Sequence, residues 1–249
     1  MRWRAATTAA AIAFPLAFGA CGSDDSSSTG SSTTSSSPTL DERRNIDSAN
    51  FVRTVDNPYY PLKPGTVYRY RGITGKRKAF EVLEVTSETK TIQGVQTTVL
   101  HDRNYVGGRL AEDTLDWYGQ DRQGNVWYFG EDTKQIDRNG KPKSSAGSWE
   151  AGKDGAVAGI FMPAEPKLGQ TLQQEYYKGH AEDFFKVVDL AASITVPYGS
   201  FTGAMRTEEW TPLEPDVLDN KYYVKGIGEV TEFSVKGPVE KLELVEIIS

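Results

Sequence analysis

The stretch that decides the fold is EDTLDWYGQDRQGNVWYFGEDT, which runs from Glu112 to Thr133. Two aromatic segments flank the polar sequence Asp121–Gly124, in which Asp at the first position and Gly at the fourth are typical of a type I turn. Gly124 can then adopt the left-handed conformation of a bulge, which gives a three-residue hairpin loop. The stretch therefore predicts two antiparallel strands joined by a tight turn.

The turn chemistry also predicts the register of this hairpin. A slip of one residue would place Asp113 opposite Asp132, and like charges in that position destabilise a sheet unless a cation binds or a carboxyl pKa rises. Calcium is the cation we expect in that case. We favour the unslipped register, which follows the turn and avoids the repulsion. Its opposed pairs are Tyr118–Tyr128, Trp117–Phe129, Thr114–Asp132, Asp113–Thr133 and Glu112–Lys134.

The aromatic residues of the hairpin alternate between two faces. In this register one face, which we assign to the core, carries Leu115, Trp117, Trp127 and Phe129. Tyr and Trp on the other face of a sheet can stack on sugar rings or line a lipid cavity, although such pairs also serve ordinary cross-strand packing. The candidate ligand-binding residues are Asp116, Tyr118, Tyr128, Trp149 and Tyr177.

The same alternation of apolar and polar residues continues through most of the chain, with turn signals between the segments. It predicts an all-β fold over residues 40–249: a single antiparallel β-meander whose curved sheet forms a half-barrel or a barrel-like structure. Residues 40–46 could form one or two helical turns. The segment 144–169 has no clear strand pattern, and we expect an irregular, lid-like insertion there.

The N-terminus has the features of a bacterial secretory signal. Arg2 and Arg4 precede an uncharged, Ala-rich stretch that is too short to span a bilayer. Residues 1–20 are therefore predicted to be a signal peptide. Cys21, the single cysteine of the chain, follows Phe18-Gly19-Ala20 and resembles the lipidated cysteine of a lipobox, although Phe18 stands where an aliphatic residue is usual. Residues 21–39 then form a Ser/Thr-rich linker, predicted to be disordered.

Net charge bounds the partners of the exported chain. The formal net charge is −6, and cleavage after residue 20 would make the chain more acidic by removing two arginines. An acidic chain without a basic run argues against nucleic acid as a partner and equally against electrostatic adhesion to anionic lipids. The expected link to the membrane is the lipid on Cys21.

Catalytic motifs are absent from the sequence: it has no phosphate-binding glycine loop, no paired metal-binding cysteines and no nucleophile elbow. His180 is the more interesting of the two histidines, because Glu175, Glu182 and Asp183 crowd the same short hairpin. In a strand, His180 and Glu182 would share a face, although a solvated polar face explains the cluster equally well. The candidate metal ligands of the chain are Asp113, Glu131, Asp132, His180 and Glu182.

Several stretches resemble an uncharacterised family of bacterial exported lipoproteins, and the resemblance covers most of the domain. They are NPYYPLKPGT (57–66), DWYGQDRQGNVWYFGEDT (116–133), QEYYKGHAEDFF (174–185), TVPYGSF (195–201) and YYVKGIGEV (222–230). The resemblance implies export and lipidation but no activity. The meander after a lipobox is also similar to lipoprotein half-barrels that hold an apolar ligand.

The sequence thus predicts a membrane-anchored, extracytoplasmic protein without enzymatic activity, which binds a small molecule, lipid or glycan on a concave aromatic face or supports the envelope. The alternative is a hydrolase that depends on carboxylates or a metal. We expect no cofactor, apart from calcium if the slipped register forms.

Overall fold

The computed structural model describes residues 38–249, and the predicted signal peptide, Cys21 and all but the last two residues of the linker lie outside them. The chain begins with one short α-helix, α1 (Leu40–Arg44), and a single 3₁₀ turn, η1 (Ser48–Asn50). Thr39 caps α1, since its hydroxyl accepts the backbone N–H of Glu42 while the Glu42 carboxylate accepts the backbone N–H of Thr39.

Strands make up most of the rest, so the all-β prediction is confirmed. They are β1 (Phe51–Val52), β2 (Val67–Thr74), β3 (Arg77–Ile92), β4 (Val95–Val106), β5 (Arg109–Asp121), β6 (Val126–Ile136), β7 (Pro142–Ser144), β8 (Trp149–Glu150), β9 (Val157–Met162), β10 (Thr171–Gln173), β11 (Glu175–Tyr176), β12 (Phe184–Val196), β13 (Gly199–Trp210), β14 (Leu218–Val224), β15 (Gly228–Lys236) and β16 (Glu240–Ile248).

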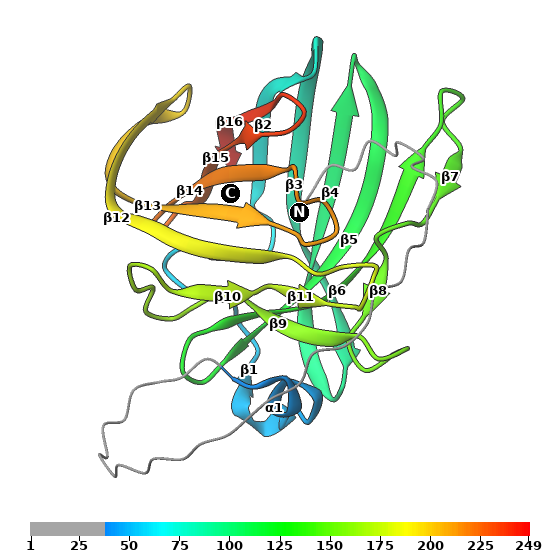
Figure 1. Cartoon of the computed structure of the whole chain (residues 1–249), viewed down its shortest axis with the longest axis vertical. Helices are drawn as coiled ribbons and strands as arrows, with labels where there is room; N and C mark the ends of the chain where they lie inside the picture. The colour runs from blue at the N-terminus through cyan, green and yellow to red at the C-terminus, as the bar shows by residue number, and fades with distance from the viewer. Residues whose placement is uncertain (1–37) are drawn as a thin grey trace, which may run out of the picture. The chain divides into compact units, whose positions relative to one another are not determined.

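These strands form one antiparallel sheet that is nearly closed into a barrel (Figure 1). β2 to β6 pair in chain order and continue through β9 to β11, while β12 to β16 pair in chain order with β10 at their outer side. The last strand, β16, pairs with β2 and joins the two series. The predicted meander is therefore present, and the pairing of its first and last long strands closes most of the barrel.

The two ends of the strand order meet at Gly159 of β9. A Cβ atom at this position would collide with the carbonyl oxygens of Gln173 and Gln174, so only glycine allows this close approach. Arg43 of α1 also links β9 and β10 at this position. Its buried guanidinium donates to the Gln173 side chain at 2.6 Å and to the Ala158 carbonyl at 3.4 Å. The short helix thereby fastens the edge of the barrel.

The β5–β6 hairpin has the predicted turn. The backbone N–H of Gly124 donates to the Asp121 carbonyl, that of Asp121 donates to the Asn125 carbonyl, and Gly124 has a φ of +94°. The Asp121 carboxylate accepts from the Asn125 backbone and from the Trp127 indole at 2.9 Å. The turn residues therefore make side-chain contacts beyond those that the turn type requires.

The predicted register is correct only beside the turn. Tyr118 lies opposite Tyr128, but Trp117 lies opposite Gly130, not Phe129. Phe129 forms a second bulge, followed by Gly130 with a φ of +129°. The sequence Glu-Asp-Thr occurs at 112–114 and again at 131–133, and neither predicted pairing of these two segments is present. The observed pairs beyond the bulge are Asp116–Glu131, Leu115–Asp132, Thr114–Thr133, Asp113–Lys134 and Glu112–Gln135.

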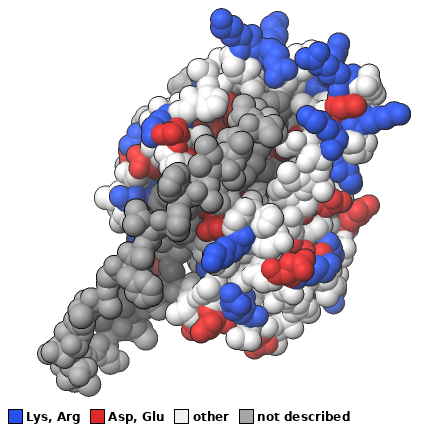
Figure 2. Space-filling model, turned by 45° about the vertical axis from the view of Figure 1, so that its right-hand side comes forward, with Lys and Arg blue, Asp and Glu red and all other residues white. Residues whose placement is uncertain are grey.

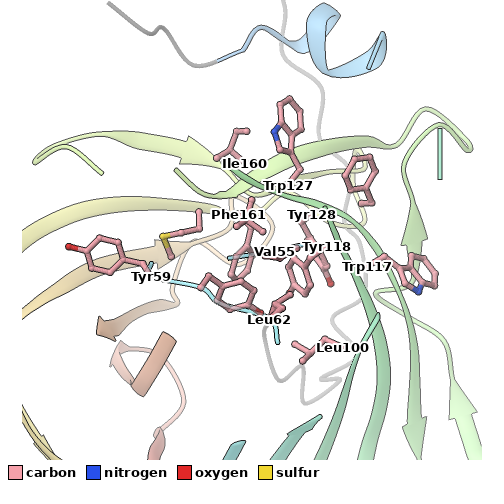
Figure 3. Close-up of a cluster of buried hydrophobic side chains, with 14 of the residues drawn as sticks. Val55, Tyr59, Leu62, Leu100, Trp117, Tyr118, Trp127, Tyr128, Ile160 and Phe161 are labelled. Carbon is pink, nitrogen blue, oxygen red and sulfur yellow. The ribbon is translucent and has the colours of Figure 1, made fainter. Parts of the chain in front are cut away.

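Both faces of this hairpin are buried, so the division into a core face and an open face is wrong. Phe51 of β1 packs edge-on against Trp127 and Phe129 on the outer face, at centroid distances of 5.8 and 5.6 Å. Tyr118 and Tyr128 lie on the inner face with Phe161 of β9 (Figure 3). The N-terminal segment covers what the meander alone would leave exposed.

The segment 144–169 is not an irregular lid. It contains β8 and β9, and all six residues of β9, VAGIFM, are buried. A strand that is buried on both faces has no alternation of polar and apolar residues, so the period-two criterion misses it. Among residues 38–249 no helix has the length and apolarity required to cross a bilayer.

Candidate functional site

The inner face of the β5–β6 hairpin carries a group of carboxyls and aromatic rings that we call the acid–aromatic cluster. Asp116 and Tyr118 come from β5, Tyr128 and Glu131 from β6. The bulge at Phe129–Gly130 keeps Tyr128 and Glu131 on the same face although three positions separate them. Two neighbouring strands, β8 and β11, contribute Trp149 and Glu175. The cluster comprises Asp116, Tyr118, Tyr128, Glu131, Trp149 and Glu175.

The Tyr128 hydroxyl bridges two carboxyls. It lies 2.6 Å from Oδ1 of Asp116 and 2.9 Å from Oε2 of Glu131. A phenol carries one hydrogen, so it can donate to only one of the two carboxyls. For both contacts to be hydrogen bonds, the other carboxyl must be protonated and donate to the phenol oxygen. The geometry thus favours one proton held between Asp116 and Glu131.

The electrostatics of the two carboxyls agree with this geometry. Burial raises the pKa of Asp116 to about 7, with further contributions from the charges of Glu112 and Glu81, while the Tyr128 hydrogen bond opposes the shift. Burial, followed by the charge of Asp116, raises the pKa of Glu131 to about 8. Near neutral pH this pair is therefore partly protonated.

Asp116 has an unused acceptor. Its side chain is fully buried, and its Oδ2 atom has no hydrogen-bond partner among residues 38–249. A buried carboxylate oxygen without a donor is costly and uncommon in a folded protein. This atom is the one place in the cluster where hydrogen-bonding capacity is left over for another molecule.

A third carboxyl, Glu175, lies beside the Asp116–Glu131 pair. The Trp149 indole N–H donates to its Oε2 atom at 2.6 Å. Burial raises the pKa of Glu175 well above its usual value, and the charges of Asp183 and Glu131 add to the shift. Oδ1 of Asp183 is also buried without a hydrogen-bond partner within residues 38–249. Carboxyl groups thus extend from β5 across the barrel interior to the segment before β12.

Aromatic rings surround these carboxyls. Tyr118 and Tyr128 stack at a centroid distance of 4.8 Å, and Trp149 meets Tyr128 edge-on at 5.3 Å. Phe161 contacts Tyr118 at 5.0 Å, and Tyr60 contacts both rings, at 5.2 Å from Tyr118 and 4.5 Å from Phe161. Figure 3 shows Tyr118, Tyr128 and Phe161 gathered together, while Trp117 points away from them. These rings help to bury Asp116 and Glu175.

A second polar group lies farther along the barrel interior, around Lys221 of β14. Its ammonium is 2.8 Å from Glu232 and 3.6 Å from both Glu209 and Glu229. Burial alone would lower the pKa of Lys221, but the three carboxylates raise it well above its usual value. Lys221 therefore stays charged and neutralises part of its surroundings.

The structure brings together five of the predicted site residues and separates the others. Asp116, Tyr118, Tyr128 and Trp149, all candidates for ligand binding, lie in the acid–aromatic cluster together with Glu131, a candidate metal ligand. Tyr177 lies outside it and stacks on His180 at 4.3 Å. The cluster also contains Glu175, which the sequence analysis named only as a neighbour of His180.

The remaining candidate metal ligands do not converge. Asp113 pairs with His101 at 2.6 Å, and Asp132 pairs with Lys134 at 3.2 Å, each on the outer face. His180 lies in an exposed turn, not in a strand, and Glu182 accepts the backbone N–H of Gly179. Within the described part of the chain, no group of three or more His, Cys, Asp or Glu residues could hold a metal ion.

Sequence reasoning missed residues of two kinds. Phe161 belongs to the apolar run VAGIFM, whose length fits a fully buried strand, so a signal was present. Asp102 and Lys221 are buried charged residues inside ordinary alternating strands. Nothing in their neighbourhood in the sequence distinguishes them from charges on an outer face, because the direction of the alternation is fixed only by the closed sheet.

No protein-family model and no curated protein matches this chain. Two solved structures resemble it. One is described as an exported protein with a YMCC-like fold from Bacteroides fragilis NCTC 9343. It aligns over 77% of this chain and 99% of its own length, with 13% identity and a TM-score of 0.44. A protein described as a lipoprotein from Parabacteroides distasonis ATCC 8503 aligns over 76% and 98%, with 12% identity and a TM-score of 0.40. At this level of similarity nothing about ligand or activity follows.

Proposed function

We propose that this protein is an extracytoplasmic lipoprotein that binds a small organic amine inside its barrel, at the acid–aromatic cluster. The observation that carries the proposal is the Oδ2 atom of Asp116, a fully buried acceptor with no partner among residues 38–249. An ammonium group carries three donors and a positive charge, which suits an unpaired carboxylate oxygen beside further carboxyls.

The charge balance of the cluster supports a cation over an anion. Asp116, Glu131 and Glu175 lie close together with Asp183 beside them, and the buried ammonium of Lys221 is engaged by other carboxylates. A fatty acid or phosphate would bring a further negative charge into this set. The rings of Tyr118, Tyr128 and Trp149 are suited to contact the cation and its methylene groups.

Two measurements test the ligand proposal. Native mass spectrometry of the chain purified from its host should detect a co-purifying small amine, and isothermal titration with spermidine as the probe should give saturable heat. Asp116→Asn should weaken spermidine binding about tenfold or more, because it removes a buried charge partner. Asp132→Asn, which lies on the outer face, serves as the matched control. Binding of maltose but not spermidine would indicate a sugar ligand, and binding of neither would reject the site.

Lipid anchoring rests on the sequence around Cys21. Cleavage before Cys21 and acylation of its thiol would leave a linker of residues 21–39 between the membrane and the barrel. Metabolic labelling with palmitate should mark the wild-type chain and not Cys21→Ser. The variant should also move from the membrane fraction to the soluble fraction, and continued labelling would contradict the assignment.

A hydrolase remains the second candidate, because two carboxyls that share a proton also suit acid–base catalysis. Asp116 would be the group that exchanges a proton with a substrate, and Glu131 its partner. The wild-type chain should then release products from purified envelope glycans, and Asp116→Asn and Glu131→Gln should each abolish that release. Release that is unaffected by either substitution would exclude these residues from catalysis.

A further inference from the structure

One end of the barrel collects basic residues at three neighbouring hairpin turns, which we call the basic edge. The β2–β3, β4–β5 and β6–β7 turns all lie at the same end, at the top of Figure 1, and the Gly107 backbone N–H of the second turn donates to the Lys78 carbonyl of the first. Lysines and arginines gather at the upper end of the face in Figure 2. The basic edge comprises Lys76, Arg77, Lys78, Arg109, Arg138, Lys141 and Lys143.

The basic edge is exposed and has one acid, Asp137, among its turns. All seven side chains are exposed, and none forms an ion pair with another residue of 38–249. The acid within these turns, Asp137, accepts the backbone N–H groups of Asn139 and Lys141. A chain with a formal net charge of −6 therefore carries a concentrated positive charge at one end.

Apolar side chains accompany the charges. Ile73 is 41% exposed and Val239 is 59% exposed. Val239 lies at the β2–β3 turn, since its carbonyl accepts the Gly75 backbone N–H. Exposed aliphatic side chains beside lysines and arginines are typical of a surface that dips into the interface of a bilayer. A soluble polyanion would contact the charges and leave these side chains in water.

We propose that the basic edge docks on the anionic surface of a lipid bilayer, with Ile73 and Val239 inserted between the headgroups. The proposal departs from the expectation, drawn from net charge alone, that the protein does not adhere to anionic lipids. The position of the basic edge at one end of the barrel sets the orientation that the docked molecule would take. Clusters of basic residues of this size bind anionic headgroups with an attraction that adds up residue by residue.

The length of the N-terminal chain permits this orientation for an anchored molecule. α1 lies at the other end of the barrel from the basic edge (Figure 1), and β3, with its 16 residues, gives the distance between the ends as roughly 50 Å. Residues 21–39, fully extended, reach roughly 60 Å. A lipid on Cys21 and the basic edge can therefore contact one membrane together, although docking itself does not depend on lipidation.

Sedimentation with lipid vesicles tests the proposal without the anchor. The probe is the chain from residue 21 onward with Cys21→Ser, mixed with vesicles of phosphatidylglycerol and phosphatidylcholine in equal parts or of phosphatidylcholine alone. We expect binding to the anionic vesicles only, and weaker binding at high salt. Equal sedimentation with both vesicle types, or with neither, would overturn the proposal.

Matched triple variants locate the contact. Lys76→Gln, Arg77→Gln and Lys78→Gln together should weaken binding to anionic vesicles roughly tenfold or more. Lys63→Gln, Lys167→Gln and Lys178→Gln change the net charge equally at exposed positions away from the basic edge, and should leave binding within about twofold. Equal weakening by both sets would show that net charge alone matters and would refute docking through the basic edge.

A separate substitution tests the apolar contact. Val239→Ser changes no charge, so it should lower the part of vesicle binding that survives high salt. Unchanged binding of Val239→Ser would refute insertion. Binding of polyphosphate in place of the vesicles would assign the basic edge to a soluble polyanion and overturn the membrane proposal. None of these results depends on spermidine binding or on lipidation at Cys21, so the proposals fail separately.

Discussion

Asp116 and Glu131 face each other directly across β5 and β6, and the hydroxyl of Tyr128 contacts both carboxyls. Opposed like charges destabilise a sheet, so this arrangement is more stable when the pair holds a proton than when both carboxyls are ionised. The interior of the barrel is therefore built for a partly protonated state. Another cation, such as a bound ammonium group, could take the place of that proton.

Stability should fall as the pH rises from about 5 to about 8. Asp116 has a pKa of about 7 in the folded chain, against an ordinary value of 3.8, so between these values the folded state binds more protons than the unfolded state. Each pKa unit corresponds to about 1.4 kcal/mol, and the loss from this carboxyl is therefore a few kcal/mol. Urea denaturation at both pH values measures it.

Asp116→Asn should flatten this pH dependence, because the amide has no charge to bury. The groups whose charges act on Asp116 include Tyr128, Glu131 and Asp102. The other buried carboxyls with raised pKa values should account for the remaining slope; they are Glu81, Asp102, Glu131, Glu175 and Glu229. Asp132→Asn, on the outer face beside Lys134, is the control and should keep the wild-type slope. An unchanged slope in Asp116→Asn would mean that the interior carboxyls are ionised in the folded state.

Tyr128→Phe removes the bridge between the two carboxyls. At pH 8 the variant should lose about 1–3 kcal/mol of unfolding free energy, the typical cost of leaving a buried polar group without its donor. The loss should be smaller at pH 5, where the carboxyls are protonated and can pair with each other. Tyr105→Phe, whose ring packs against Phe80 on the outer face, controls for the loss of a hydroxyl. Equal losses at both pH values would contradict a proton held through Tyr128.

Gly130→Ala should disrupt the bulge that places Glu131. A Cβ atom there would collide with the Trp149 carbonyl, and the φ of +129° is itself unfavourable for alanine. Gly140→Ala is the control. Gly140 also has a positive φ, +78°, but a Cβ atom there would meet open space, so the substitution should cost only about 1–2 kcal/mol. We expect a larger loss for Gly130→Ala, together with a changed Trp149 fluorescence spectrum. Equal losses of unfolding free energy for the two variants would mean that β8 shifts to accommodate the added methyl group at little cost.

The sequence predicts the hairpin turn and the strand class well because both depend on neighbours along the chain. Asp121 and Gly124 determine the turn by themselves, and alternation marks each long strand. The second bulge depends on a contact outside the hairpin, because Gly130 packs closely against the Trp149 carbonyl of β8. The register beyond Trp117, and with it the Asp116–Glu131 pair, could not be read from the hairpin alone.

The candidate site was found in part for a similar reason. The alternation along the hairpin places Asp116, Tyr118 and Tyr128 on one face, so these three could be named together. Glu131 was named only as a candidate metal ligand, because the bulge that brings it to the same face was not predicted. Glu175 reaches them only because β9 pairs with both β6 and β11. The basic edge was missed because its charges come from three separate turns, of which only the first has consecutive basic residues, Lys76-Arg77-Lys78.

Lys221→Met tests whether the second interior group also depends on charge balance. Removal of the ammonium leaves Glu209, Glu229 and Glu232 without their common cation, and breaking such a buried pair costs about 3–5 kcal/mol. Glu229, with a pKa of about 7, takes up a proton at pH 5, so the loss should be smaller there than at pH 8. Lys225→Met, an exposed lysine over the Tyr59 ring, should cost less than about 1 kcal/mol at either pH. An equal loss of unfolding free energy for Lys221→Met at the two pH values would mean that Lys221 stabilises the fold through packing of its aliphatic chain. Only the charge interaction changes with protonation.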